Sequence, residues 1–216
     1  MNTLHHAPSA AARRLRTGMA VAACWAGLVT VAHSASVQVA VLDAAGKPVP
    51  DAVVFLDSAQ ARQRVKPLPG VEMGQDKKLF MPDVLVVPVG TEVRFPNNDS
   101  VRHHVYSFSP AKKFEIKLYA GTPTNPVLFD RPGVVVLGCN IHDLMVGWVV
   151  VVDTPHYTLS AAPGGRALID NVPPGNYTLR TWHSRLPVGA PALEQAITVP
   201  ATGTATASVR MTGLEP

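Results

Sequence analysis

Charged side chains are scarce in this sequence: Asp, Glu, Lys and Arg make up 16% of its 216 residues, against about 25% in ordinary soluble domains. Three of the 19 Lys and Arg residues lie in the first 35 residues, which hold no acid, and the remaining 16 face 15 Asp and Glu, a net charge of +1. This balance provides no basic surface for nucleic acid, so no nucleic-acid partner is expected. Hydrophobic residues at 47%, with 20 Pro and 16 Gly, instead favour a packed, loop-rich globular protein.

Long hydrophobic runs are also missing, except near the N-terminus. The apolar run Met19–Val31 follows three arginines within residues 13–16 and precedes small residues up to Ala35, which is the anatomy of a secretory signal peptide. We therefore predict a signal peptide over residues 1–35, cleaved near Ser34 or Ala35, and a periplasmic mature protein. A retained anchor is the alternative, but the run is shorter than the about 20 residues of a spanning helix, so no stable membrane span is expected after cleavage. The arginines do not decide between the general and the twin-arginine export route.

Cysteine is limited to two residues. Cys24 lies inside the predicted signal peptide, where Val-Ala-Ala-Cys also resembles a lipoprotein cleavage box, a minor alternative. Removal of the signal peptide leaves Cys139 as the lone thiol of an exported protein, a setting in which thiols are normally paired. An internal disulfide is then excluded, and Cys139 is buried and inert, linked to another chain, or held by a metal.

Sustained helical periodicity is absent from the predicted mature chain. Val37, Val39 and Val41 alternate with other residues before a Gly-Lys-Pro turn and a second short strand, and residues 113–121 alternate in the same way. The valine-rich runs 133–138 and 146–153 are typical of buried strands. Turn signals recur at a spacing of roughly 8 to 12 residues, as in β-sandwiches. The sequence therefore predicts an all-β fold.

Residues that can bind a metal gather in the middle of the chain. His103 and His104 lie 36 and 35 residues before Cys139, and His142 and Met145 follow it at three-residue intervals. Two imidazoles, a thiolate and a thioether suit copper that cycles between Cu(I) and Cu(II), whereas zinc usually takes more thiolates or keeps an open position. Taken singly, each residue has a plainer role, as a surface histidine, a small buried cysteine or a methionine that fills the core. Their order and spacing together favour a metal site.

Two motifs in this region resemble those of a known family. The segments FMPDVLVVPVGTEVRFPNNDSVRHHV and CNIHDLMVGWVVV resemble the ligand-bearing strands and loops of cupredoxins, in particular plastocyanin and amicyanin, over residues 79–153. The resemblance implies a cupredoxin Greek-key β-sandwich over residues 76–153 that holds one copper ion in a type 1 site. Its ligands would be His103, Cys139, His142 and, as a weak axial ligand, Met145.

The upstream ligand is expected to be His103 rather than His104. The resemblance aligns His103 with the family's ligand, and adjacent residues of a strand face opposite sides, so that only one of the two can enter the site. Whether His104 tunes the site or lies at the surface stays open. His156 and His183 lie outside the pattern and are not expected to bind metal.

The flanking segments resemble a different family. VQVAVLDAAGKPVPDAVVFL and GRALIDNVPPGNYTLRTWH look like the two halves of carboxypeptidase-regulatory-like domains, which are small Ig- or transthyretin-like β-sandwiches. This resemblance implies that residues 36–75 and 154–216 form a second sandwich. The alternative is that residues 36–57 supply the first cupredoxin strands. The joint order resembles exported proteins that are labelled methylamine-utilization or plastocyanin-like proteins.

The resemblance implies an exported blue copper protein that carries single electrons between periplasmic redox partners, such as cytochrome-like or dehydrogenase-like proteins. No nucleophile and base have a supporting spacing, so we expect no enzyme, and we expect a monomer. Lys112, Lys113 and Lys117 could steer an acidic partner, although a solvated strand face is the plainer interpretation. Two other functions stay open: copper binding for delivery, storage or sensing without fast electron transfer, and a structural or adhesion sandwich whose site is vestigial.

Overall fold

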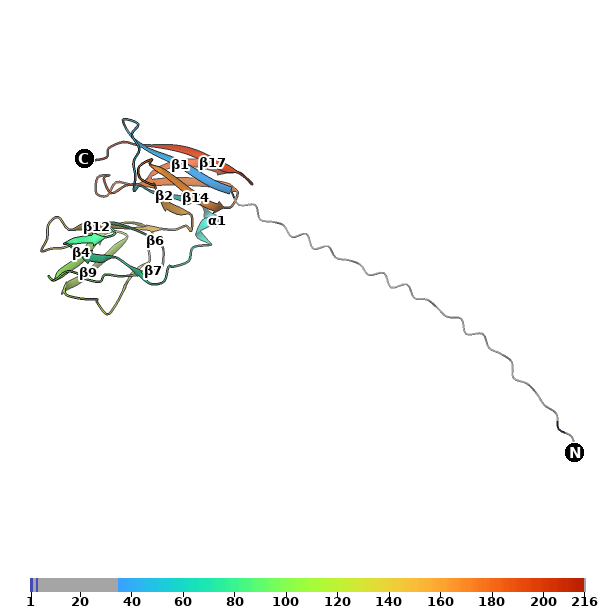
Figure 1. Ribbon diagram of the computed structural model, residues 1–216, viewed down its shortest axis with the longest axis horizontal. Helices are drawn as coiled ribbons and strands as arrows, with labels where there is room; N and C mark the ends of the chain where they lie inside the picture. The colour runs from blue at the N-terminus through green and yellow to red at the C-terminus, as the bar shows by residue number, and fades with distance from the viewer. Residues whose placement is uncertain (2, 4–34, 216) are drawn as a thin grey trace. The chain divides into compact units, whose positions relative to one another are not determined.

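A computed structural model describes residues 1, 3 and 35–215 of the chain. Cys24 and all of the predicted signal peptide except residues 1, 3 and 35 therefore lie outside the described residues. Within the described part, β-strands dominate, and the one helix, α1 (Ala59–Arg62), has four residues. The prediction of an all-β fold is confirmed (Figure 1). No helix of this part is long and apolar enough to cross a membrane.

Strands from the two ends of the chain pair with one another and form what we call the flanking sandwich (Figure 1). β1 runs antiparallel to β14 and parallel to β17 in one sheet, and the second sheet has the order β13-β2-β15-β16. β1 and β2, which are neighbours in the sequence, therefore lie in different sheets. The bounds are β1 Ala35–Asp43, β2 Val53–Asp57, β13 Tyr157–Leu159, β14 Arg166–Val172, β15 Gly175–Trp182, β16 Leu193–Val199 and β17 Thr204–Met211.

The middle of the chain forms a second group of sheets, which we call the central sandwich. Its largest sheet has the order β6-β12-β11-β8-β9, with β6 parallel to β12, and smaller sheets have the orders β10-β7-β3 and β4-β5. The bounds are β3 Val71–Glu72, β4 Gly74–Asp76, β5 Leu79–Met81, β6 Val84–Pro88, β7 Thr91–Arg94, β8 His103–Ser109, β9 Lys112–Tyr119, β10 Val127–Phe129, β11 Gly133–Gly138 and β12 Val146–Val152.

The five-stranded sheet is buried on both faces where β12 runs. Val149 and Val151 belong to the core of the central sandwich, together with Leu137 and Cys139. Val150 and Val152 point to the other face and belong to the core of the flanking sandwich. Successive side chains of a strand face opposite sides, so a strand between two cores has to be apolar at every position. This explains the uninterrupted valine run of β12.

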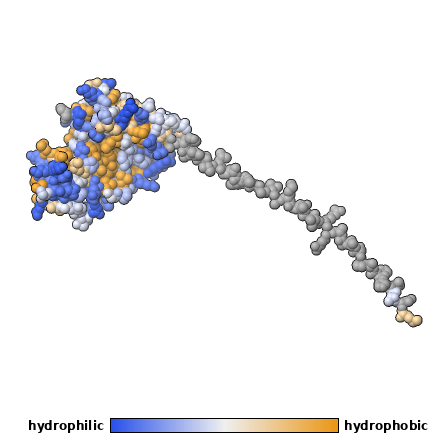
Figure 2. Space-filling view, in the orientation of Figure 1, coloured by the Kyte–Doolittle hydropathy of each residue, from blue (hydrophilic) through white to orange (hydrophobic). Residues whose placement is uncertain are grey.

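Polar and apolar residues are unevenly distributed over the surface. Figure 2 shows hydrophobic residues gathered in patches among hydrophilic ones on the visible face. The large hydrophobic side chains with the highest exposure in residues 35–215 are Leu144 at 93%, Val188 at 81% and Phe108 at 78%. Leu144 lies on the loop between β11 and β12, whereas Phe108 and Val188 line a cleft.

Candidate metal centre

Three candidate ligand atoms converge at one end of the five-stranded sheet. His103 begins β8, Cys139 follows the last residue of β11, and His142 lies on the loop that leads to β12. The ligand atoms of these residues lie within 4.8 Å of one another. Cys139 Sγ is 3.9 Å from His103 Nδ1 and 3.6 Å from His142 Nδ1. Both imidazoles therefore turn the same ring nitrogen toward one sulfur atom.

The loop between β11 and β12 follows from the pairing of the two strands. Gly138 pairs with Val146, which closes residues 139–145 into a tight hairpin loop. Inside the loop, the Met145 N–H donates to the His142 carbonyl at 2.9 Å. This turn brings Met145 back into the sandwich, where its side chain is 1% exposed and belongs to the same apolar cluster as Cys139. Three-residue spacing from Cys139 to His142 to Met145 thus places all three on the inner side of one loop.

His103 is fixed by a partner that the sequence analysis missed. Its ring is fully buried, and its Nε2–H donates to Asp99 Oδ2 at 2.7 Å. The Asp99 carboxylate also accepts the backbone N–H groups of Lys77 at 2.7 Å and Lys78 at 2.8 Å. The bond from the Lys78 N–H is the main cause of the lowered pKa of Asp99, with the bond from His103 contributing after the opposing effect of burial. An ionised Asp99 keeps the proton on Nε2 and leaves the Nδ1 lone pair free toward Cys139.

The turn that Asp99 holds has an uncommon backbone. Lys77 and Lys78 connect β4 to β5 with φ of 51° and 60°, in the left-handed region that side chains other than glycine seldom adopt. The two N–H groups of this turn have Asp99 as their shared acceptor. One carboxylate therefore links the strained turn of the β4-β5 hairpin to a candidate metal ligand. The only sequence signal for this role is an acid four residues before His103.

His104 faces the other side of β8, as strand alternation predicts. Its Nε2 lies 3.0 Å from Glu115 Oε1, without the geometry of a hydrogen bond, and its ring lies 5.5 Å from that of Tyr106. His104 is not part of the group of converging ligand atoms. The structure places the other two histidines in or beside the flanking sandwich: His183 Nε2 lies 3.1 Å from the Pro50 carbonyl, and His156 packs edge-on against Tyr177.

A second buried network holds the loop that leads to His103. Asn97 donates through Nδ2 to the carbonyls of Val101 at 2.8 Å and Tyr119 at 3.1 Å. The Tyr119 hydroxyl donates to the Phe95 carbonyl at 2.7 Å and accepts from Gln75 Nε2. Burial raises the pKa of Tyr119 to about 12, so this phenol stays protonated and keeps its hydrogen bond. These contacts join β4 and β9 to the loop that carries Asp99.

The centre is enclosed on the protein side and open at one edge. Cys139 and Met145 are buried, whereas His142 is half-buried on a loop whose neighbours Ile141 and Leu144 are 49% and 93% exposed. The His142 ring lies 4.9 Å from the His103 ring, between centroids. Any group that approaches the ligand atoms closely therefore does so past His142.

Fold and ligand atoms together define a class of protein: an all-β protein in which two histidines and one cysteine converge at the end of a sandwich sheet. No family model and no curated protein matches the chain, but solved structures match parts of it. A purple cupredoxin from Nitrosopumilus maritimus is 26% identical and covers 38% of this chain and 99% of its own, with a TM-score of 0.35.

Two further solved structures are those of copper proteins. A Cu-containing nitrite reductase from Thermus scotoductus SA-01 is 29% identical, with coverage of 41% of this chain and 23% of its own and a TM-score of 0.37. The reduced Cu(I) form of an amicyanin variant is 20% identical, with coverage of 46% of this chain and 98% of its own and a TM-score of 0.36. Each match covers less than half of this chain.

Proposed function

We propose that this chain is an exported type 1 copper protein that carries single electrons between periplasmic redox partners. The observation that supports the proposal most directly is the convergence of His103 Nδ1, Cys139 Sγ and His142 Nδ1 within 4.8 Å. Two imidazoles and one thiolate are the planar ligand set of blue-copper centres. One copper ion is the proposed cofactor, and it would supply a one-electron Cu(I)/Cu(II) couple.

The residues present fit copper better than other metals. No carboxylate belongs to the converging group in the described part of the chain, which disfavours calcium and magnesium. A structural zinc site would take four ligands and usually more thiolates. Met145 is buried in the same cluster as Cys139, and its thioether is the proposed weak axial ligand. The set is soft and mixed, as a metal that changes between Cu(I) and Cu(II) requires.

Each ligand has a distinct proposed role. Cys139 supplies the thiolate that binds most strongly and couples the metal to the chain. His103 is held by Asp99, so its Nδ1 stays oriented whether or not an electron has been transferred. His142 is the half-buried ligand and forms the edge through which electrons enter or leave. The packed core of Phe80, Val149 and Leu137 excludes water behind these residues.

The proposed partners are redox proteins of the cytochrome-like or dehydrogenase-like class. Ile141 and Leu144 expose apolar side chains beside His142, which allows a protein partner to approach the ligand edge closely. The protein is proposed to act as a monomer in the periplasm. The flanking sandwich is proposed to be a non-catalytic module of the carboxypeptidase-regulatory-like kind.

Copper reconstitution tests this function. The purified chain titrated with Cu(II) is expected to bind one ion and to develop an intense visible sulfur-to-copper charge-transfer band, which disappears on reduction. Cys139→Ser removes the thiolate and is expected to abolish the band, whereas the matched control Met211→Leu, at a buried sulfur residue in the core of the flanking sandwich, keeps it. A colourless protein that binds Cu(I) tightly would instead support copper delivery or sensing. A band that persists in Cys139→Ser would contradict the assignment of the thiolate.

A further inference from the structure

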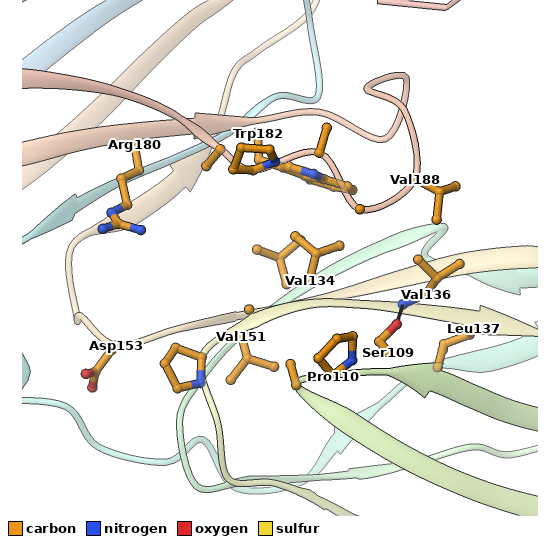
Figure 3. A pocket seen from close by; sticks show the side chains of 18 of the residues that line it. Ser109, Pro110, Val134, Val136, Leu137, Val151, Asp153, Arg180, Trp182 and Val188 are labelled. Carbon is orange, nitrogen blue, oxygen red and sulfur yellow. Dashed lines mark hydrogen bonds between the residues drawn. The ribbon is translucent and has the colours of Figure 1, made fainter.

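A cleft with two walls lies beside the candidate metal centre, on the opposite face of the five-stranded sheet (Figure 3). One wall consists of outward-facing residues of β8 and β11, and the other of Phe55, Trp182 and the loop Val188–Ala192. Its volume is about 1100 Å³, which is slightly above the usual range for small-molecule sites. Figure 3 shows Trp182 and Arg180 across the cleft from Val134. On the β8 and β11 side, the wall includes Tyr106, Phe108, Val134, Val136 and Gly138.

The cleft is apolar along its length and polar at one end. Asp57, Arg62, Asp153 and Arg180 line this end. Arg62 pairs with Asp57 at 2.6 Å and with Asp153 at 3.5 Å, and the side chains of Arg62, Asp153 and Arg180 keep 51%, 35% and 34% of their surface exposed. The polar end therefore offers N–H donors and carboxylate acceptors side by side. A ligand group that both donates and accepts, such as a hydroxyl, matches that arrangement.

The cleft reaches the residue that is covalently bonded to Cys139. Gly138 lines the cleft, and the Tyr106 ring occupies the space that a side chain at this position would fill. A Cβ atom at Gly138 would lie 2.9 Å from both Cζ and Oη of Tyr106, so the phenol ring of Tyr106 rests directly against this backbone. Tyr106 and Phe108 have ring centroids 5.3 Å apart, and Phe108 is 78% exposed at the mouth. Only one peptide unit and the cysteine side chain separate the cleft wall from Sγ.

We propose that this cleft binds a planar aromatic hydroquinone and that its electrons reach the metal centre through Gly138 and Cys139. Aromatic walls suit a flat ring, and the polar end suits its hydroxyl groups. The electron step rests on the function proposed above and names a donor for it. One hydroquinone gives up two electrons and two protons and becomes a quinone. The electrons reduce two Cu(II) centres to Cu(I) in two single steps, on two protein molecules, and the protons pass to solvent past the half-buried Asp153.

Binding is measured first, on the copper-free chain, so that it does not depend on the metal. The probe is 2,3-dimethyl-1,4-naphthoquinone, whose ring has no free position that would react with a thiol. Trp182 lines the cleft, and the Trp148 ring lies 6.5 Å from it, between centroids, so the probe is expected to quench tryptophan fluorescence with saturation at one equivalent.

Three variants decide whether the quenching comes from the cleft. Val136→Phe fills the cleft and is expected to weaken binding by about tenfold or more, and Phe108→Ala, at an exposed position that the fold tolerates, is expected to weaken it as well. Leu168→Phe on β14 is the matched control, since Leu168 is 53% exposed and does not line the cleft, and it is expected to bind like the natural chain. Quenching without saturation, or equal binding by Val136→Phe and Leu168→Phe in folded proteins, overturns the proposal.

The electron step is measured on the copper-loaded chain by stopped-flow loss of the visible band. With the corresponding hydroquinone, the rate is expected to reach half of its maximum near the concentration that half-saturates the quenching, and Val136→Phe is expected to slow it. Ascorbate, which approaches the His142 edge, is expected to reduce the natural chain and Val136→Phe at the same rate. If the quenching saturates but Val136→Phe leaves the rate of copper reduction by the hydroquinone unchanged, the proposed electron route is overturned. Absence of a visible band refutes the proposed function, and with it this route, while the quenching still decides whether the cleft binds the aromatic ring.

Discussion

Replacing Asp99 tests how far the centre depends on the residue behind His103. Asp99→Ala removes the acceptor of the His103 Nε2–H bond of 2.7 Å and the shared acceptor of two backbone N–H groups in the Lys77 and Lys78 turn. The backbone N–H groups are exposed and can bond to water instead. The buried His103 ring has no such replacement, so most of the loss is expected at the metal centre.

The magnitude follows from the kind of bond that is lost. A hydrogen bond to a charged group contributes about 1.5 to 3 kcal/mol, and removing the partner of a metal-bound histidine typically weakens metal binding by about 10- to 100-fold. We expect Asp99→Ala to fall in this range. Asp99→Asn is expected to lose less, because its amide oxygen can still accept the His103 proton although the negative charge is gone.

Competition with a chelator of known copper affinity measures the effect, and circular dichroism confirms the fold of each variant. Asp130→Ala is the matched control, because Asp130 is another carboxylate with a lowered pKa, caused first by its bond from Lys112, and it contacts no candidate ligand. Equal copper affinity of Asp99→Ala and the natural chain would refute the reasoning. An equal loss in Asp130→Ala would show that the effect comes from overall charge and not from the position of His103.

Three further predictions concern single side chains. Met145→Leu is expected to keep copper bound and to raise the reduction potential in voltammetry, since a weak axial thioether tunes the site without holding the metal; loss of copper would contradict that role. His103→Ala is expected to lose the visible band and His104→Ala to keep it, and the reverse spectra would overturn the assignment. Burial lowers the pKa of His156 and His183, so the unfolded chain binds more protons below about pH 6.5 and the melting temperature is expected to fall from pH 7 to pH 5. His156→Leu should reduce this slope, and an unchanged slope would rule out a contribution from His156.

The sequence predicts the fold class and the convergence of His103, Cys139 and His142 better than it predicts the hydrogen bonds that hold these side chains in place. Alternation along β8 separates His103 from His104 because side chains of a strand face opposite sides, and the structure places them so. The short loop from Cys139 to Met145 is a local feature, since its turn depends on neighbours in the sequence. Asp99 is near His103 in the sequence, but its role depends on the distant Lys77 and Lys78 turn, whose backbone no periodicity reveals.

The cleft could not be predicted for a related reason. The sequence pattern indicates only that Gly138 ends a valine-rich strand and that Tyr106 belongs to a strand. Only the pairing of Gly138 with Tyr106 brings the phenol ring against the backbone beside Cys139. Trp182 and the loop Val188–Ala192 come from a part of the chain about 50 residues further on, and their position depends on how the flanking sandwich packs. Contacts of this kind leave no pattern within either segment.

The sheet that is buried on both faces also limits how this protein can be divided. β12 contributes Val149 and Val151 to one core and Val150 and Val152 to the other, so a fragment cut after residue 153 would expose a row of aliphatic side chains to water. Such a surface promotes aggregation. The hairpin that carries Cys139 and Met145 therefore cannot be transplanted or expressed by itself without first replacing the outward valines, and the flanking sandwich acts as a built-in cover for the strand on which the metal centre rests.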